Sequence, residues 1–247
     1  MCSQKIKWLQ FNLLSGIPKL KHAVLLRQGG CSQDDYASLN LSDNVGDNPD
    51  FVEKNLLKVK ETLAIEHLFW AHQCHGKHIH EVNNSLMNHV PSADALVTNI
   101  PHCTLMVTHA DCQATIMYDP IHNAIANVHA GWRGSVQNIF KETIEYMRFR
   151  YGSHPQELLV CISPSLGPEN AQFIHYKQEL PEPFWHFQHR PEYFNFWEIS
   201  RMQLERCGVL SHHIEISGID THANSTDFFS YRRDKKTGRH GTLVTLV

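Results

Sequence analysis

Residues 125–151 read IANVHAGWRGSVQNIFKETIEYMRFRY and join a short β-rich run to a long helical pattern. Residues 125–128 favour a strand, and the turn that follows contains Gly131 and Gly134. From residue 135 to residue 151, apolar side chains recur on one face at helical spacing, and Gly152 follows as a stop signal. We therefore predict a strand that leads into a helix over 135–151.

The flanking segments repeat both kinds of pattern. Upstream, Asn48 and Pro49 start an amphipathic helix of about 15 residues, because proline is tolerated in the first helical turn. Downstream, a second amphipathic helix covers 195–207 and is stopped by Gly208. Strands are predicted at 68–70, 78–82, 95–98, 104–108, 114–118, 125–128, 158–162 and 214–216. The patterns leave parallel and antiparallel pairing open.

No internal repeat and no Gly-, Ser- or Pro-rich linker divides these patterns. We therefore predict a single α+β domain over residues 1–247. The aromatic and Pro-rich stretch 180–196 is interpreted as a packed surface excursion rather than a hinge.

Composition narrows the class of partner. The chain has 247 residues, of which 42% are hydrophobic, and a formal net charge of -3, so no broad positive field favours nucleic acid or an anionic membrane. No run approaches the roughly 20 apolar residues of a membrane span, and residues 1–10 lack the apolar core of a signal peptide. The seven cysteines form no CxxC pair. We expect reduced thiols in a cytoplasmic protein with a small-molecule partner and make no prediction of its oligomeric state.

Three segments place candidate metal ligands directly after strand-like runs. They are WAHQCHG around His75, MVTHADC ending in Cys112, and ANVHAGWRG around His129. Imidazole nitrogen and thiolate sulfur are ligands that zinc favours, and three protein ligands leave a fourth position for water or substrate. We predict an open, catalytic metal site that holds zinc, with copper as the alternative.

The same residues allow a second interpretation. His75 and His129 would then be hydrogen-bonded core histidines, and Cys112 a small buried hydrophobe. The nearby rival ligands are His72, Cys74 and His109.

The segment HAGWRGS also suits an anion. Arg133 and the unpaired N–H groups of a helix that starts near Ser135 would attract phosphate, unless Arg133 instead ties the loop to a carboxylate. Asp111, and Asp94 in ADALVT, are candidate proton-transfer groups beside a metal-activated water. Aspartates at turns also act as ordinary caps, which is the alternative for both.

An ordered set of further strings spans nearly the whole chain. It comprises RQGGCS, YASLNL, NVGDN, QCHG, ADALVT, HADC, VHAGWRG, CISPSLGP and DFFSYRRDKKTGR. In these strings the chain resembles the YfiH-type family, also called laccase-domain or multicopper polyphenol oxidase proteins and purine nucleoside phosphorylases.

The resemblance implies a fold, a site and an activity. The fold is a layered α/β/β/α domain, and the metal ligands are His75, Cys112 and His129. The activity is phosphorolysis of adenosine, inosine, guanosine and methylthioadenosine, together with adenosine deamination. Independently of the resemblance, the candidate contacts to phosphate or the nucleoside are Arg133 and Ser135, and further candidates are Arg27, Asn40, Arg232, Arg233 and Arg239.

Several positions depart from the family pattern, although none is a proposed ligand. Gln172 stands where glutamate is common, and His109 stands where threonine is frequent. Gln113 and Ala114 replace an apolar-Pro pair, and residues 220–222 read Asp-Thr-His in place of Asp-Cys-Thr.

Three other functions remain open from the residues. One is a Cys-His hydrolase, with Cys112 as nucleophile and His129 or His75 as base, as in a peptidoglycan-related amidase or editing enzyme. Another is a copper-dependent polyphenol oxidase, a laccase, for which only His78 and His80 resemble paired copper ligands. The last is a metal-stabilised interaction module that uses the aromatic stretch near Trp185 and Trp197.

Overall fold

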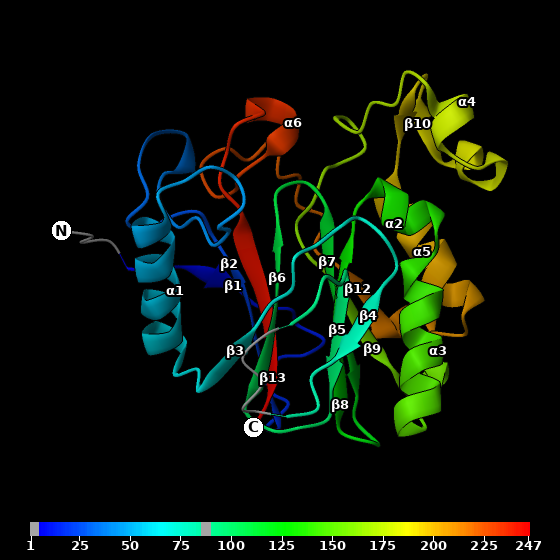
Figure 1. The fold of residues 1–247 in the computed structure, drawn as a ribbon. Coiled ribbons are helices and arrows are strands. Elements are labelled where there is room, and N and C mark those ends of the chain that lie inside the picture. The colour runs from blue at the N-terminus through cyan, green and yellow to red at the C-terminus, as the bar shows by residue number, and fades with distance from the viewer. Residues whose placement is uncertain (1–4, 85–89) are drawn as a thin grey trace.

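Two mixed β-sheets lie face to face in the computed structural model, which describes residues 5–84 and 90–247 (Figure 1). The first sheet has the order β1 (Trp8–Leu9), β2 (Leu20–Leu25), β13 (His240–Leu246), β6 (Cys103–His109) and β3 (His67–Phe69). The second has the order β12 (Ile214–Ile216), β9 (Leu159–Ile162), β7 (Gln113–Asp119), β8 (Ala124–Ala130), β5 (Ala95–Thr98) and β4 (Ile79–Glu81). Each sheet contains parallel and antiparallel pairs.

Helices cover the outer faces of both sheets. The helix α1 (Pro49–Leu63) lies on the first sheet, while α3 (Ile139–Tyr151) and α5 (Phe196–Arg206) lie on the second (Figure 1). The layers therefore run α/β/β/α, which confirms the predicted α+β class and layered fold.

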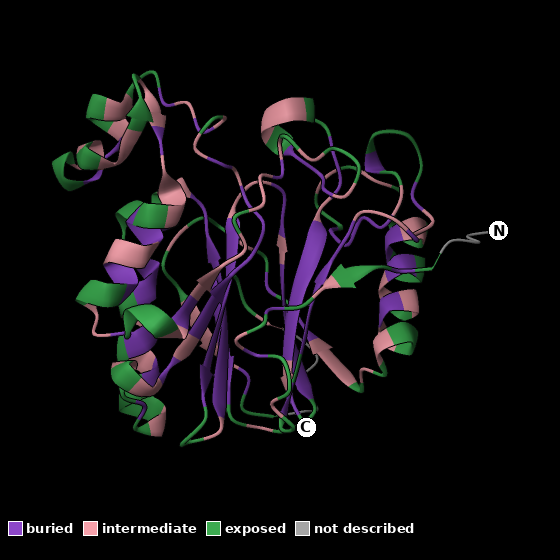
Figure 2. Ribbon diagram, turned by 180° about the vertical axis from the view of Figure 1, so that it is seen from behind, coloured by how far each residue is buried: buried purple, intermediate pink, exposed green. Residues whose placement is uncertain are grey.

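The central strands are buried on both faces. All 7 residues of β7 and all 7 of β8 are buried, because one face meets the first sheet and the other meets α3 (Figure 2). Such strands show no polar–apolar alternation, which explains why the sequence left their pairing open.

The predicted helix over 135–151 is wrong at its start. Two helices occupy this region, α2 (Trp132–Val136) and α3, and they are separated at Asn138. Asn138 has φ 55°, a left-handed conformation that interrupts the α2 turn, and its side chain accepts the Lys141 N–H to cap α3.

The other predicted helices and strands are confirmed within one or two residues at each end. The sequence patterns did not predict β1, β2 and β13. They also missed short elements, which are η1 (Asp34–Tyr36), η2 (Pro155–Glu157), α4 (Tyr176–Glu179), η3 (Glu182–Phe187), β10 (Gln188–Arg190), β11 (Tyr193–Phe194), η4 (Ser211–His213) and α6 (Tyr231–Asp234).

The stretch 180–196 is packed, as interpreted. It contributes Leu180, Phe184 and Phe194 to an aromatic cluster with Phe173 and Ile199. In Figure 1 this region projects beside α2 and α5, at one end of the second sheet.

One expectation about the cysteines is wrong. Cys31 is disulfide-bonded, whereas the expectation was that every thiol is reduced. Cys2 lies outside the described residues. The free cysteines are Cys74, Cys103, Cys112, Cys161 and Cys207. Within the described ranges, no helix combines the length and apolar character needed to cross a membrane.

Candidate metal centre

The three predicted ligands meet where the chain passes from the first sheet to the second. Cys112 lies in the turn between β6 and β7, His129 lies near the end of β8, and His75 lies in the loop between β3 and β4. The register pairs Ala114 of β7 with His129 of β8, so the start of β7 brings Cys112 toward His129.

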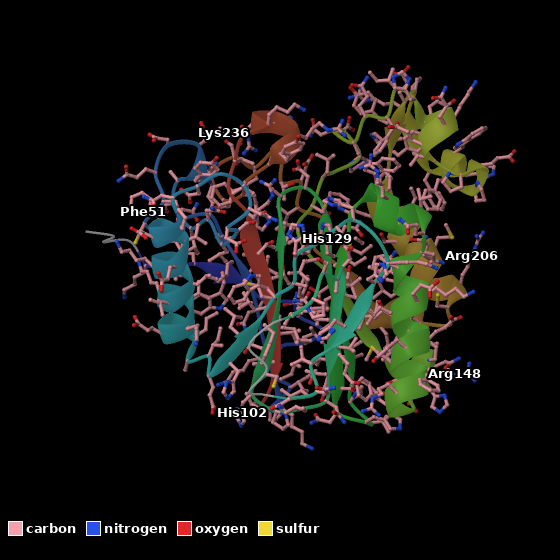
Figure 3. The ribbon with its side chains drawn as sticks, in the orientation of Figure 1. Phe51, His102, His129, Arg148, Arg206 and Lys236 are labelled. Carbon is pink, nitrogen blue, oxygen red and sulfur yellow. The ribbon has the colours of Figure 1, made fainter. Side chains whose placement is uncertain are left out.

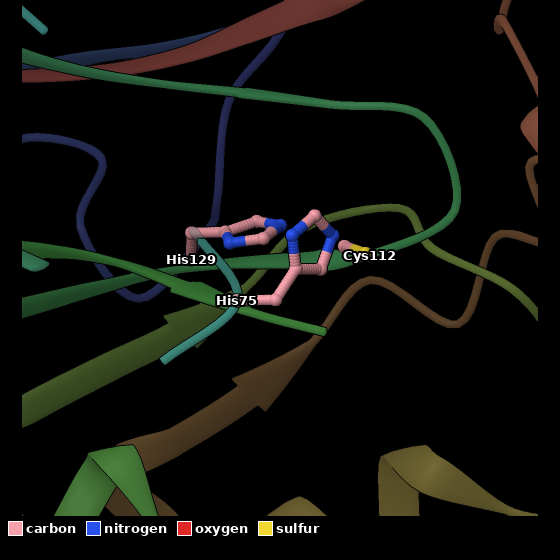
Figure 4. A group of neighbouring side chains, drawn as sticks. All are labelled: His75, Cys112 and His129. Carbon is pink, nitrogen blue, oxygen red and sulfur yellow. The ribbon is translucent and has the colours of Figure 1, made fainter. Parts of the chain in front are cut away.

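The ligand atoms of His75, Cys112 and His129 all lie within 4.8 Å of one another (Figure 4). The two imidazole rings have centroids 4.9 Å apart and planes at 87°. Two imidazoles and one thiol within such a distance form a donor set that fits zinc, and copper also accepts it. Among the described residues, no fourth histidine, cysteine or acidic side chain joins this group.

Gly131 allows the backbone to pass close to the cluster. A Cβ atom at this position would lie 3.0 Å from Cys112 Sγ and 3.0 Å from His75 Cδ2. Any larger residue would therefore displace two of the three ligands.

Asp94 is the residue that orients this cluster. It is 1% exposed, and its Oδ1 accepts hydrogen bonds of 2.9 Å from His129 Nδ1 and 2.9 Å from the His75 N–H. Its Oδ2 accepts a bond of 2.7 Å from the Gly76 N–H and one of 3.1 Å from Cys74 Sγ. Because Nδ1 of His129 is engaged, its Nε2 is directed to the ligand cluster.

Asp94, His129 and Cys112 stabilise one another's charged forms. Burial alone would raise the pKa of the Asp94 carboxyl, but hydrogen bonds from His129, Cys74 and Gly76 hold it well below its usual range. Burial opposes the charged form of His129, yet the Cys112 thiolate and Asp94 raise its pKa to about 9. Burial would also raise the pKa of Cys112, but His129 and His75 lower it to about 6. The thiol is therefore prepared to be a thiolate, the form that binds metal.

Two cavities adjoin the cluster. The larger, of about 760 Å³, is lined by all three ligand residues and by Arg239. The smaller, of about 400 Å³, is lined by His75 and Cys112 and extends toward α2 and α6. A group bound in either cavity can reach the cluster, so the site is open.

The predicted proton-transfer and anion-binding residues fall into two sets. Arg133 and Arg232 line the smaller cavity, and Arg239 lines the larger. Asp111 also lines the smaller cavity, but its carboxylate accepts the Thr221 hydroxyl at 2.7 Å and the Arg232 N–H at 2.5 Å. Asp111 therefore ties α6 to the site.

Three other candidates line neither cavity. The Arg27 guanidinium donates to the carbonyls of Ala37 and Ser225. The Asn40 amide donates to Ser42 O and Asp47. The Arg233 guanidinium donates to the carbonyls of Thr221, His222 and Phe228. Each of these side chains holds loops together.

The prediction of an unpaired N–H at Ser135 is wrong. Because α2 begins at Trp132, the Ser135 N–H donates to Gly131 O at 2.9 Å inside the helix. Ser135 is also 1% exposed. Positive charge near this turn therefore comes from side chains rather than from a helix start at Ser135.

The rival ligands have other roles. Cys74 donates to Asp94, His72 bonds Asn44, and the ring of His109 bonds the Thr242 hydroxyl. In the described part of the chain, His78 and His80 belong to no group of side chains that could hold a metal ion.

Several large side chains in the walls of the smaller cavity were not predicted as site residues. These residues are Trp132, Phe173, Phe196, Tyr231 and Lys235. Trp132, Tyr231 and Lys235 lie inside quoted strings, whereas Phe173 and Phe196 come from segments that gave no local signal.

The layered α/β/β/α fold carries a group of two histidines and one cysteine that could hold a metal ion. The family model described as "Multi-copper polyphenol oxidoreductase laccase" matches residues 21–247, so the chain belongs to this YfiH-type family.

Curated relatives and solved structures cover nearly the full chain. A "Purine nucleoside phosphorylase" of Bacteroides thetaiotaomicron is 30% identical, covering 94% of this chain and 94% of the relative. The "Purine nucleoside phosphorylase YfiH" of Escherichia coli is 31% identical, covering 90% and 91%. The structure of YlmD from Geobacillus stearothermophilus has a TM-score of 0.86 at 27% identity, covering 97% and 96%.

Proposed function

We propose that residues 1–247 act as one cytoplasmic, zinc-dependent purine nucleoside phosphorylase domain, with copper as the alternative metal. The observation that carries the proposal is the cluster of His75, Cys112 and His129, with ligand atoms within 4.8 Å and an open side. The printed names of the curated relatives support the phosphorylase activity. The family resemblance adds adenosine, inosine, guanosine and methylthioadenosine as substrates and adenosine deamination as a second reaction.

The two cavities suit the two substrates of phosphorolysis. The larger cavity, of about 760 Å³, has a volume typical of small-molecule sites and would take the nucleoside. The smaller cavity carries Arg133, Arg232 and Lys235 and would take phosphate. Phosphate and nucleoside would then meet beside His75 and Cys112, which line both cavities.

The residues of the chain have separate tasks in this scheme. Asp94 holds His129 in one tautomer and fixes the His75 loop, so it is a positioning residue. Asp111 positions Arg232 through its backbone N–H. Arg133 and Arg232 would bind phosphate and hold it against the ribose carbon from which the purine leaves. A zinc ion at this centre would supply Lewis acidity close to the substrates.

Product analysis on adenosine tests the proposal. The purified protein is expected to release free base from adenosine only when phosphate is present, and Cys112→Ser should abolish this release. Cys207→Ser, which alters a half-buried thiol outside both cavities, is the matched control. Base release at an equal rate without phosphate would refute the phosphorylase activity.

Deamination requires a separate measurement, because it attacks the purine ring rather than the ribose. If one centre serves both reactions, inosine formation from adenosine should fall together with base release in Cys112→Ser. Loss of only one reaction would show that they do not share the centre.

A Cys-His hydrolase is the second candidate function. The observation in its favour is the lowered pKa of Cys112, about 6, beside His129, whose Nδ1 bonds Asp94 at 2.9 Å. A thiolate, an imidazole and an orienting carboxylate are the parts of a cysteine nucleophile system. Chelators separate the two functions, because a thiol hydrolase would survive metal removal and lose activity on alkylation of Cys112.

A further inference from the structure

A second group of side chains that could bind a metal ion lies at the opposite end of the β7–β8 hairpin. The register pairs Asp119 with Ala124 at this end and Gln113 with Ala130 at the end near the first cluster. Six residues of β-strand span about 20 Å, so the two groups share no ligand and no cavity lining. The end of α3 reaches the same region, and Figure 3 labels Arg148 there, away from His129.

Asp119, His122 and Glu157 make up this group. One ligand atom from each lies within 4.8 Å of the others. Asp119 ends β7, His122 lies in the β7–β8 turn, and Glu157 ends η2 just before β9. The residues therefore come from two separate connections of the second sheet.

The local hydrogen bonds explain Asp119 but not Glu157. Asp119 Oδ1 accepts the N–H groups of Ile121 and His122 at 2.8 Å and 3.0 Å, as expected for a turn aspartate. Glu157 Oε2, by contrast, is buried and has no hydrogen-bond partner among residues 5–84 and 90–247. A buried carboxylate oxygen without a partner is costly, and the Glu157 carboxylate lies near that of the wholly buried Asp119.

A cation would remove that cost. His122 Nδ1 lies 2.9 Å from Asp119 Oδ2, a distance that suits a hydrogen bond and is also close to the spacing of two ligands on one ion. One imidazole and two carboxylates are a donor set for zinc and for other divalent transition-metal ions.

We propose that Asp119, His122 and Glu157 bind a second divalent cation of the zinc class, which ties the β7–β8 turn to the connection between α3 and β9. The ion has a structural task, because these residues line neither cavity of the first cluster. Binding to the folded chain stabilises it, since the unfolded chain does not hold the three groups together.

Metal stoichiometry after equilibration with Zn²⁺ tests the proposal. We expect two equivalents in the unmodified chain and one in Glu157→Gln. We expect one in the double variant His75→Ala/Cys112→Ser and none when all three substitutions are combined. His154→Gln, in an exposed neighbouring histidine outside the group, should keep two.

Thermal unfolding provides a second measurement. Zn²⁺ should raise the Tm of His75→Ala/Cys112→Ser by roughly 5 °C and should leave the triple variant unchanged. Circular dichroism without metal should show that all variants are folded. If His75→Ala/Cys112→Ser binds no Zn²⁺, or binds an equivalent that Glu157→Gln does not remove, the second site is wrong.

Discussion

The two ends of the β7–β8 hairpin carry histidines in different settings. At one end, His129 meets His75 and Cys112 from distant loops, and two cavities open onto the cluster. At the other end, His122 lies three residues from Asp119 in the same turn, and the group lines neither of those cavities. In our proposals, one end of the hairpin contributes to catalysis and the other binds a structural ion.

The carboxylates differ in the same way. Asp94 accepts hydrogen bonds from His129 Nδ1 and from backbone N–H groups. It therefore orients a proposed ligand without being a ligand itself. Asp119 lies among the candidate ligands themselves. At the first cluster, the carboxylate of Asp94 lies outside the proposed ligand set, so a coordination position stays open. At the second group, the carboxylates would themselves be ligands.

Removing a ligand at the cavity end should have the largest effect on activity. His129→Ala is expected to reduce base release from adenosine by roughly 10³-fold or more, because an ion that stabilises the transition state by several kcal/mol is lost. Steady-state kinetics would measure this loss. His122→Ala at the other end should leave kcat within about twofold of the value for the unmodified chain. An equal loss in both variants would contradict the proposed difference between the two ends of the hairpin.

Removing the orienting carboxylate should have a smaller effect. Asp94→Asn is expected to weaken zinc binding by about 10- to 100-fold, because His129 loses its fixed tautomer and the His75 loop loses an acceptor. Competition with a chromogenic chelator would measure the affinity. Asp43→Asn, which also alters a carboxylate at the larger cavity, is the control and should bind zinc as the unmodified chain does.

Substitutions in the smaller cavity should weaken the binding of phosphate and leave the binding of the nucleoside unchanged. Arg133→Met and Arg232→Met are each expected to raise the KM for phosphate by about tenfold, since each removes a cationic contact worth roughly 1.4 kcal/mol. The KM for the nucleoside should change little. Lys236→Met removes a cation that pairs with Asp35 outside both cavities and serves as the matched control. An equal rise in both KM values would contradict the assignment of the two cavities.

A buried histidine outside both ends should show the smallest effect. Burial lowers the pKa of His22 to about 4, although Glu215 opposes this, and the ring accepts the Phe11 N–H at 2.8 Å. Since the folded pKa lies below the unfolded value, stability is full above about pH 6.5 and is lost as pH falls toward 4. Between pH 7 and pH 6 the part of the loss that comes from His22 should be roughly 0.7 kcal/mol.

Urea unfolding at the two pH values would measure this change. His22→Gln keeps an acceptor without titrating and should show a smaller loss between pH 7 and pH 6. A larger loss in His22→Gln than in the unmodified chain would reverse the sign assigned to the His22 pKa.

The sequence predicted the fold class and the ligand cluster because both leave local traces. Strand-like runs precede His75, Cys112 and His129, and the strand ends bring them together. The break at Asn138 was not predicted, because asparagine in a left-handed conformation looks like any polar residue within a helical pattern.

The walls of the site depend on tertiary packing instead. The Phe173 ring contacts the rings of Trp132 and Phe196, and these three residues come from segments that are far apart in the sequence. The roles of Arg27, Asn40 and Arg233 as loop contacts likewise follow from carbonyl positions that no spacing reveals. Residue type therefore identified the cations, and only the coordinates separated those at the cavities from those that hold loops.

The position of the zinc ion by anomalous diffraction is the most direct test of the central claim. The account predicts one ion with Zn–S of about 2.3 Å to Cys112, Zn–N of about 2.0–2.1 Å to His75 and His129, and a fourth position that faces the larger cavity. An ion that lacks Cys112, or one closed by a fourth side chain, would contradict it.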